Sequence, residues 1–425
     1  MRIYIVGGYC RDTLLGLQPK DRDFVVVGSS PAEMLSLGFT QVGKSFPVFL
    51  NEHGEEFALA RTERKVGVGY NGFDTDWNGV TLEEDLYRRD LTINSISREV
   101  DTKSLLADDT INFVGDYIDP YKGIEDIKDK ILRPVSKYFS YDPVRLLRAA
   151  RFLSRYEGFT VSDSLMKAGI ALEHSGELDA LVPDRVWKET EKVLGYKHPE
   201  RYFEFLLKFN MLFMEVFSYM EATVEGNLWH QEKNVFVHSM MVLKHANATW
   251  SDPEVNFACL LHDIAKSACY AERGNGHGHD AEGVVMIEEW CKQWKVPNNY
   301  KDLAKIVCEQ HQKVHSVFGR GSNGWVKPKS IMKMFEQTSA LSKPERFSKM
   351  LKACESDSFG RISDDVAIDY PQRAYLEECL QATLDLDTKG ISKNLLAKGK
   401  KGCMIGEQIR VARIDAIRKV YNEWK

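Results

Sequence analysis

The chain has 425 residues, of which 43% are hydrophobic and 28% charged, and its formal net charge is −5 at pH 7. These values are typical of a globular protein with two to four units that each bury a core, and they argue against a generally basic nucleic-acid coat. No apolar run is long enough to span a bilayer, and the eight cysteines lack the spacing of a zinc knuckle or a disulfide framework. We therefore expect no membrane contact and a reducing, cytoplasmic compartment.

The N-terminal window predicts a strand, a tight turn and a short helix. Arg2–Val6 is the expected strand, Gly7 and Gly8 form the turn, and Gly16 closes the helix. Free N–H groups at the start of that helix favour an anion such as a triphosphate. Arg11, one turn further on, is expected to clamp the same anion with paired donors.

Two carboxylates follow on a second predicted strand. Asp21 and Asp23 are two residues apart, so we expect them on one face of the strand, with Arg22 on the other. Neighbouring carboxylates repel unless a cation lies between them, and oxygen ligands beside phosphate suit Mg²⁺. A hairpin turn and a solvated strand end are the alternatives. The combination in one short window favours a metal-nucleotide site.

This window, VGGYCRDTLLG…KDRDFVVVG, resembles the signature of the class II tRNA nucleotidyltransferases, or CCA-adding enzymes, in the polymerase-beta-like superfamily. The resemblance continues almost to the C-terminus and is close to the bacterial multifunctional type that carries an HD phosphohydrolase domain. It implies template-independent addition of CCA to the 3′ end of tRNA from CTP and ATP, with release of pyrophosphate. It also implies that Asp21 and Asp23 are catalytic ligands of Mg²⁺ and that Gly8 and Arg11 bind the nucleotide.

Patterns along the chain predict an α/β head followed by helices only. Short β-rich runs at 24–27, 48–50 and 56–60 alternate with short helical pieces up to about Val135, beyond which we expect no strand. The fold class implied is a polymerase-beta-like head, with a mixed sheet and helices, followed by an all-α neck, HD domain and tail. The conformation of 101–117 is left open. The predicted domains are the head (1–135), the helical neck with a base-reading helix (136–225), the HD domain (226–360) and the basic helical tail (361–425).

Glu56 stands at the start of the third β-rich run. The resemblance makes it a third carboxylate beside Asp21 and Asp23. An exposed glutamate at a strand end is the alternative.

The segment 83–97 is predicted as one helix, with Asp90 and Asn94 one turn apart and Arg89 beside them. A helix surface with polar pairing is the alternative. The motif RRDLTIN in this segment matches the family, and the resemblance implies that Arg89 contacts the bound nucleotide while Asp90 and Asn94 lie by its ribose.

Asp142 and Pro143 predict the start of another helix, with Asp142 as its N-cap. Arg145, Arg148 and Arg151 recur every three residues, and a row of cations on one face requires anions or carboxylates opposite. Pairing with acidic residues of a neighbouring helix is the alternative to an anion site. The resemblance implies that Asp142 and Arg145 hydrogen-bond the incoming base and that Arg148 and Arg151 bind the triphosphate.

Protein side chains would then replace a nucleic-acid template. An arginine donor and a carboxylate acceptor match cytosine and, after small rotations, adenine. Uracil and guanine would leave buried groups unpaired, at about 1–3 kcal/mol each. Tyr141 departs from the family pattern, in which many relatives carry Glu. Asp184 and Arg185 match a following neck motif that is expected to brace the base-reading helix.

A second group of functional side chains lies in the helical part of the chain. Its histidines and aspartates come from several predicted helices, which favours a metal site over isolated buried pairs. The members are His238, His262, Asp263, His279, His311 and Asp357.

The pattern resembles the HD phosphohydrolases. The resemblance makes His238, His262, Asp263 and Asp357 metal ligands, and makes His279 and His311 candidates for a second ion or for phosphate. Lys266 is placed to meet phosphate. Imidazole ligands suit Ni, Co, Mn or Zn, so we expect a metal-dependent phosphodiesterase or phosphatase, with 2′,3′-cyclic phosphates at damaged tRNA ends as candidate substrates.

The C-terminal stretch 389–425 has ten Lys and Arg residues against three Asp and Glu, and could bind the phosphates of the tRNA acceptor end. A solvated helix face is the alternative. Two rival functions remain: a poly(A) polymerase or partial CC- or A-adding enzyme on the same scaffold, and an HD phosphohydrolase with an inactive, RNA-binding head. Both a monomer and a homodimer are compatible with the sequence.

Overall fold

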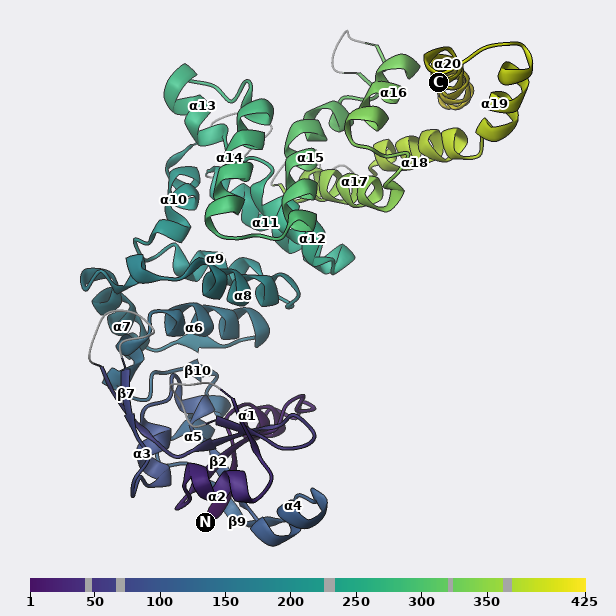
Figure 1. Cartoon of the computed structure of the whole chain (residues 1–425). Helices are drawn as coiled ribbons and strands as arrows, with labels where there is room; N and C mark the ends of the chain where they lie inside the picture. The colour runs from purple at the N-terminus through teal and green to yellow at the C-terminus, as the bar shows by residue number, and fades with distance from the viewer. Residues whose placement is uncertain (43–47, 66–72, 225–233, 320–323, 362–368) are drawn as a thin grey trace. The chain divides into compact units, whose positions relative to one another are not determined.

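The computed structural model describes residues 1–42, 48–65, 73–224, 234–319, 324–361 and 369–425 (Figure 1). The chain forms two compact units, one of residues 1–189 with 201–212 and one of residues 190–200 with 213–425. The predicted division into four domains at 135, 225 and 360 stays a prediction.

A seven-stranded mixed sheet forms the centre of the first unit, as predicted, in the order β3-β4-β5-β2-β1-β8-β9. Neighbouring strands are antiparallel except β2 and β5, which are parallel. The hairpin of β6 (Thr62–Lys65) and β7 (Phe73–Asp76) stands apart from this sheet. The strands of the sheet are β1 (Arg2–Val6), β2 (Asp23–Val27), β3 (Thr40–Val42), β4 (Val48–Leu50), β5 (Glu56–Leu59), β8 (Ser97–Val100) and β9 (Phe113–Ile118).

The pairing of β2 with β5 sets the position of the charged residues at their first ends. Phe24 is opposite Phe57 in the register, and the two buried rings stack with their centroids 4.4 Å apart. The preceding pair in the same register is Asp23 and Glu56. Burial of the aromatic pair therefore brings the two carboxylates side by side.

Short helices connect the strands of the head. The segment 101–117, left open by the sequence, contains helix α4 and most of strand β9. The second strand begins at Asp23, so Asp21 lies in the loop before it, and the prediction that both aspartates are strand residues is wrong. The helices are α1 (Gly8–Leu14), α2 (Pro31–Ser36), α3 (Leu82–Tyr87), α4 (Thr102–Asp108) and α5 (Gly123–Lys128).

The prediction of one helix over 83–97 is also wrong. Helix α3 ends at Tyr87, and only a short 3-10 turn, η1 (Thr92–Asn94), follows. The backbone between them bonds to a distant segment instead: the N–H of Thr92 donates to the carbonyl of Arg133 at 2.9 Å, and the N–H of Val135 donates to that of Asp90 at 3.2 Å. These long-range bonds take the place of the helical pattern.

The rest of the first unit is helical apart from two short parallel strands, β10 (Ile131–Leu132) and β11 (Thr160–Val161). The expectation of no strand beyond Val135 is therefore wrong for β11. Helix α6 begins at Val144 with Pro143 as its N-cap, so the prediction of Asp142 at that position is wrong by one residue. The carboxylate of Asp142 still accepts from the Val144 N–H at 3.1 Å. The helices here are η2 (Lys137–Tyr141, a 3-10 helix), α6 (Val144–Arg155), α7 (Asp163–His174), α8 (Pro183–Leu194) and α9 (Glu200–Leu206).

Helices alone form the second unit over its described residues. Helices α11, α12, α15 and α17 pack against one another, and α14 packs against α15. In the part of the chain that the structure describes, no helix is both long and apolar enough to cross a membrane. The helices are α10 (Glu215–Ala222), α11 (Val235–Trp250), α12 (Pro253–Leu261), α13 (Lys266–Arg273), α14 (His279–Gln293), α15 (Asn298–His315), α16 (Pro328–Gln337), α17 (Pro344–Phe359), α18 (Pro371–Leu384), α19 (Thr388–Ala397) and α20 (Cys403–Trp424).

Candidate active sites

The Gly-Gly turn after β1 brings two guanidinium groups close to the backbone. Gly7 has φ +64°, a conformation that glycine tolerates best, and a Cβ added there would lie 3.3 Å from Nη1 of Arg89. A Cβ on Gly8 would lie 3.7 Å from Nη2 of Arg11. The structure therefore brings three predicted site residues, Gly8, Arg11 and Arg89, to this turn.

Three carboxylates gather at the first ends of β2 and β5. Asp23 is paired with Glu56 in the register, and Asp21 precedes it in the loop. Neighbouring atoms that exclude water, and then the like charge of Glu56, raise the pKa of Asp23, whereas the charges of Arg89 and Arg11 oppose the rise. A cluster whose negative charges repel one another in this way is suited to a divalent cation with oxygen ligands.

Arg22, in the loop before β2, binds other carboxylates. Its guanidinium binds the carboxylate of Glu55 and, at 2.6 Å, that of Asp109. These pairs tie the loop before β2 to residues at the start of β5 and the end of α4, which fixes the backbone that carries Asp21.

A buried polar network joins the Gly-Gly turn to helix α6. Arg11 donates to the side-chain oxygen of Asn94, and the Asn94 amide donates to Asp90 at 2.9 Å. Arg148 of α6 donates to the other oxygen of Asp90 at 2.7 Å. Although burial opposes ionisation, Arg148 and the Asn94 amide hold the pKa of Asp90 well below its usual range. Arg11 also pairs with Asp12 at 2.8 Å.

The carboxylate at the start of α6 is held in a fixed orientation. Both nitrogens of the Arg185 fork on α8 donate to Asp142, at 3.0 and 2.7 Å. Such a bidentate pair fixes the plane of the carboxylate as well as its position. The contact predicted for Arg185 is therefore present at the start of α6, while the base-reading role of this helix stays a prediction.

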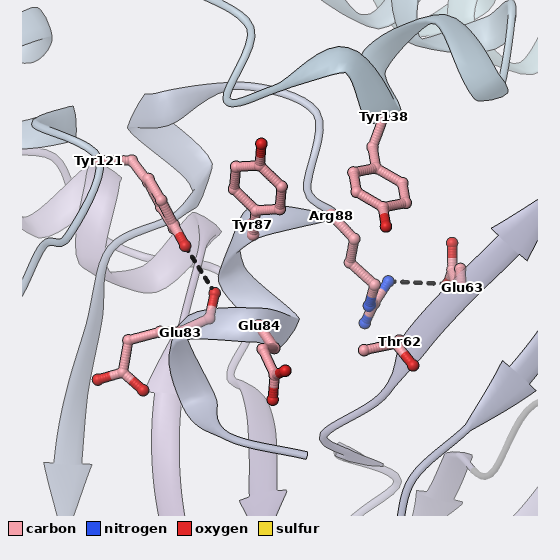
Figure 2. Close-up of a pocket in the computed structure, with 8 residues that line it drawn as sticks. All are labelled: Thr62, Glu63, Glu83, Glu84, Tyr87, Arg88, Tyr121 and Tyr138. Atoms are coloured by element: carbon pink, nitrogen blue, oxygen red, sulfur yellow. Dashed lines mark hydrogen bonds and ion pairs between the residues drawn. The ribbon is translucent and has the colours of Figure 1, made fainter.

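Arg145 lies beside Asp142 and donates to backbone carbonyls. Its Nη1 is 2.9 Å from the carbonyl oxygen of Tyr138 and 3.4 Å from that of Arg89. Next to this position is a cavity of about 410 Å³, in which the rings of Tyr87 and Tyr138 lie edge to face with centroids 5.7 Å apart (Figure 2).

Arg88 closes one side of that cavity. It donates to Glu63 at 2.9 Å, as Figure 2 shows, and to buried Asp85. It therefore braces the wall of the cavity, while Arg89, its neighbour, reaches the Gly-Gly turn.

The three arginines of α6 do not share one set of partners. Arg145 faces carbonyl groups and Arg148 faces Asp90, whereas buried Arg151 donates to Glu189 on α8 and stacks on Phe152, 4.4 Å from the ring centre. Carboxylates thus lie opposite two of the three, and that of Arg151 belongs to a neighbouring helix, which is the structural pairing that the sequence left as an alternative.

The second unit gathers two groups of potential metal donors, each buried. The first is His238, His262 and Asp357, and the second is Asp263, His279 and His311. Asp263 lies between them, because Oδ2 is 3.1 Å from Nε2 of His262 while Oδ1 is 3.2 Å from Nε2 of His279. Every ligand candidate predicted in this part of the chain therefore belongs to one cluster.

The hydrogen bonds of the imidazole rings show how these donors are oriented. Nδ1 of His262, His279 and His311 lies 2.7, 2.7 and 2.8 Å from a backbone carbonyl oxygen, which only accepts. We infer that Nδ1 carries a proton, so that Nε2 is the atom that would offer its lone pair to a bound cation. Nε2 of His262 is 3.3 Å from that of His238, and Nε2 of His279 is 3.2 Å from that of His311. Ring nitrogens that converge in this way fit a shared cation.

The charges around Asp263 favour its ionised form. Burial opposes ionisation, but His262 and Lys266 hold the pKa of Asp263 well below its usual range. The Lys266 ammonium lies 2.8 Å from Oδ2. Lys266, predicted to meet phosphate, is thus beside the donor cluster and already paired with one of its carboxylates.

Sequence reasoning missed His315. Its Nε2 lies 2.7 Å from Oδ2 of Asp357, and its Nδ1 lies 2.9 Å from the hydroxyl of Tyr370. The spacing carried a signal, because His311 and His315 are four residues apart and hence on one face of helix α15.

Comparison with known proteins gives matches over the whole chain. Residues 3–133 match the family model of the poly A polymerase head domain, and residues 235–333 match that of the HD domain. Two curated relatives, both described as multifunctional CCA proteins, come from Shewanella denitrificans and Shewanella frigidimarina. They are 41% and 40% identical to this chain, and each alignment covers 98% of this chain and 97% of the relative.

Solved structures of CCA-adding enzymes have a similar fold. An apo form has a TM-score of 0.64 at 19% identity, with 99% of this chain and 91% of that one covered. The enzyme of Bacillus stearothermophilus in complex with CTP has a TM-score of 0.61 at 20% identity, covering 98% and 89%. The Thermotoga maritima enzyme complexed with tRNA has a TM-score of 0.58 at 18% identity, covering 100% and 92%.

Proposed function

Because the chain belongs to the family of multifunctional CCA proteins, we propose that its head adds CCA to the 3′ end of tRNA from CTP and ATP and that its HD cluster hydrolyses phosphate esters. The tRNA 3′-OH attacks the α-phosphate of the nucleotide, and pyrophosphate leaves. The observation that carries the proposal for the head is that the register places the carboxylates of Asp23 and Glu56 side by side. The positive charges of Arg89 and Arg11 act on the same carboxylate of Asp23 and favour its ionised form.

The family models of the head and of the HD domain both imply the use of divalent metals. In the head, Asp21 and Asp23 would hold Mg²⁺, with Glu56 as a third oxygen donor, and the ion when bound would stabilise the charge of the reacting phosphate. Like-charge repulsion within this cluster supports the assignment. The stacked rings of Phe24 and Phe57 fix the register of β2 and β5. This register sets the position of Asp23 and Glu56 at the strand ends, where they would hold the ion.

The nucleotide would bind along the polar network between the Gly-Gly turn and α6. Gly8 permits close approach of the backbone, and Arg11, Arg89 and Arg148 supply positive charge. Asn94 and Asp90 lie between Arg11 and Arg148 and hold these two in place. In this arrangement Asp90 and Asn94 would face the ribose, as the family resemblance implies.

Arg151, which is also proposed to bind the triphosphate, is buried. It is already engaged by Glu189 and Phe152. Its proposed contribution is therefore long-range positive charge beside Arg148, together with the packing of α6 on α8.

Asp142 and Arg145 would read the base. Changing either to Ala is expected to reduce the preference for CTP and ATP over UTP and GTP by about 10- to 100-fold, because one hydrogen bond to a charged group is worth roughly 1.5–3 kcal/mol. Rates of single-nucleotide incorporation with each of the four triphosphates measure this. Asp163→Ala, which removes an exposed carboxylate from α7, is the matched control. Unchanged selection in both site variants would refute the base-reading role.

Arg185→Ala tests the brace on that carboxylate. Without its bidentate partner, Asp142 can rotate away from the base edge, so we expect kcat/KM for CTP and ATP to fall about 10-fold and discrimination against UTP to weaken. The loss of Arg185 should leave the affinity for tRNA unchanged. Lys188→Ala, an exposed change on the same helix, should behave as wild type. A pure loss of thermal stability with normal selection would contradict this role.

The HD cluster would act as a metal-dependent phosphodiesterase or phosphatase. Its mixed imidazole and carboxylate donors suit Ni, Co, Mn or Zn, and 2′,3′-cyclic phosphates at tRNA ends are the proposed substrates. When bound, the metal would lower the pKa of a water molecule and polarise the phosphoryl group. His238, His262, Asp263 and Asp357 would hold the first ion. His279 and His311 would, with Asp263, hold a second ion or contact phosphate, and the Lys266 ammonium is within reach of the same phosphate.

The partners proposed are CTP, ATP and the tRNA acceptor end, with the basic stretch 389–425 as a phosphate-binding surface. Seven of the eight cysteines are buried and all are free, which supports a reducing cytoplasm. Incubating the protein with tRNA that lacks its 3′ end, with labelled CTP and ATP separately and together, tests the function. CCA addition requires both. A poly(A) polymerase would extend repeatedly with ATP alone, a partial enzyme would stop after CC or require CC in advance, and an inactive head would add nothing.

A further inference from the structure

The carboxylate of Asp357 has two oxygens with different surroundings. Oδ1 faces the donor cluster, 3.1 Å from Nε2 of His238 and 3.6 Å from Nε2 of His262. Oδ2 lies 2.7 Å from Nε2 of His315, which belongs to neither of the two donor groups. Asp357 is therefore held through Oδ2, while Oδ1 is left facing His238 and His262.

His315 differs from the neighbouring histidines in the partner of its Nδ1 atom. In His262, His279 and His311 this atom faces a backbone carbonyl, whereas in His315 it faces the Tyr370 hydroxyl at 2.9 Å. A hydroxyl can donate, and Nε2 faces a carboxylate that can only accept. The consistent assignment is a chain of donors from the Tyr370 O–H to Nδ1 and from the Nε2–H to Asp357.

We propose that His315 and Tyr370 are positioning residues that hold Asp357 with one oxygen aimed at the metal, and that they are not ligands themselves. The chain is buried: Tyr370 is 6% exposed, and the side chains of His315 and Asp357 are each 11% exposed. A hydrogen-bonded partner of this kind orients a metal-binding carboxylate and sustains metal affinity. The inference rests on the metal role proposed above for the cluster.

One helix brings this support to both halves of the cluster. His311, on α15, reaches Asp263 with Nε2 at 3.6 Å from Oδ1, and His315, one turn later, reaches Asp357. Tyr370 stands at the start of α18, immediately before Pro371, which fixes the backbone there. Rigid elements thus hold the two carboxylates at a set separation.

Titration of the chelator-treated full-length protein with Co²⁺, followed by calorimetry and by the visible absorption of the bound ion, tests the proposal. His315→Ala should weaken binding about 10- to 100-fold without changing the number of ions bound. His315→Gln, whose amide can still donate to Asp357, should recover most of the affinity. Tyr370→Phe removes only the hydroxyl and should weaken binding about 2- to 10-fold, as expected for one hydrogen bond.

Two controls separate the possible results. His245→Ala changes a histidine on α11 that stacks on Phe359 and should bind Co²⁺ as wild type does. CCA addition by the same preparations reports folding of the remaining chain, and if His315→Ala does not fold, Tyr370→Phe and His315→Gln carry the test. If the wild-type protein binds no Co²⁺, the proposed metal site fails. If it binds Co²⁺ and His315→Ala and Tyr370→Phe bind it equally well, the positioning role alone fails. Loss of a whole equivalent of metal in His315→Ala would show a ligand instead and would also overturn the proposal.

Discussion

Changing Asp23 to Ala should reduce CCA addition at least about 1,000-fold, because a bound metal supplies several kcal/mol of charge stabilisation to the reacting phosphate and each 1.36 kcal/mol is tenfold in rate. The fold should survive. The raised pKa of Asp23 shows that the structure disfavours its charge, since water is excluded nearby and Glu56 repels it. Removing the carboxylate therefore relieves repulsion, and the melting temperature should stay level or rise.

Incorporation of labelled CTP and ATP into tRNA lacking its 3′ end, with thermal unfolding of the same samples, measures both effects. Asp116→Ala, on strand β9 of the same sheet, removes another carboxylate exposed to solvent and is the matched control. Glu56→Ala should have a smaller effect than Asp23→Ala, because it leaves two oxygen donors in place. Normal CCA synthesis by Asp23→Ala would rule out the metal role of this strand end. If Asp23→Ala is inactive because it unfolds, Asp23→Asn is the variant that decides.

The double change His262→Ala and Asp263→Ala should abolish hydrolysis of a 2′,3′-cyclic phosphate, a fall of at least about 1,000-fold, while CCA addition continues. His262 belongs to the first donor group, and Asp263 contributes an oxygen to each group. The two changes therefore remove donors from both. Activity with added Ni²⁺, Co²⁺ or Mn²⁺ is compared with that of wild type and of His245→Ala.

Asp263→Asn distinguishes structural damage from loss of chemistry in the same experiment. The amide has nearly the same volume but one less acceptor and no charge, and Lys266 at 2.8 Å would lose its ionic partner. We expect metal binding and hydrolysis to fall while the unfolding transition remains cooperative. Full hydrolysis by the double variant would show that this cluster does not carry the phosphohydrolase chemistry.

Local patterns predicted the parts of the head that depend on neighbouring residues. The strand before the Gly-Gly turn, the apolar strand after Asp23 and the third strand at Glu56 were all identified, because alternation and turn residues are properties of short windows. The parallel partnership of β2 and β5 was not visible in the same way. It depends on two segments about thirty residues apart, and only the family resemblance placed Glu56 beside the aspartates.

The segment around Arg89 shows why other predictions were wrong. Its polar residues have helical spacing, but the backbone N–H of Thr92 donates to the carbonyl of Arg133 instead. The periodicity of a short segment cannot indicate a hydrogen-bond partner that lies about forty residues further along the chain. Asp90 and Asn94 nevertheless meet, with the Asn94 amide 2.9 Å from the carboxylate, because a turn can bring such residues together as well as a helix can.

The side chains of α6 and α15 illustrate the same difference. Three arginines at regular spacing suggested a common anion, yet Arg151 binds Glu189 on a helix whose packing the sequence did not specify. His315 was overlooked because its partners, Asp357 and Tyr370, lie far along the chain. Residue type and spacing identify candidates, while the pairing of distant elements decides which of them meet.

The stacked rings of Phe24 and Phe57 have a consequence for how the head can evolve. They are interior residues with no polar atom to offer a substrate, yet a slip of one position between their strands would turn Glu56 to the reverse side of the sheet. Purifying selection on the chemistry should therefore extend inward to this aromatic couple. Substitutions of these two residues would lower the rate of catalysis before they lowered the amount of folded protein in the cell.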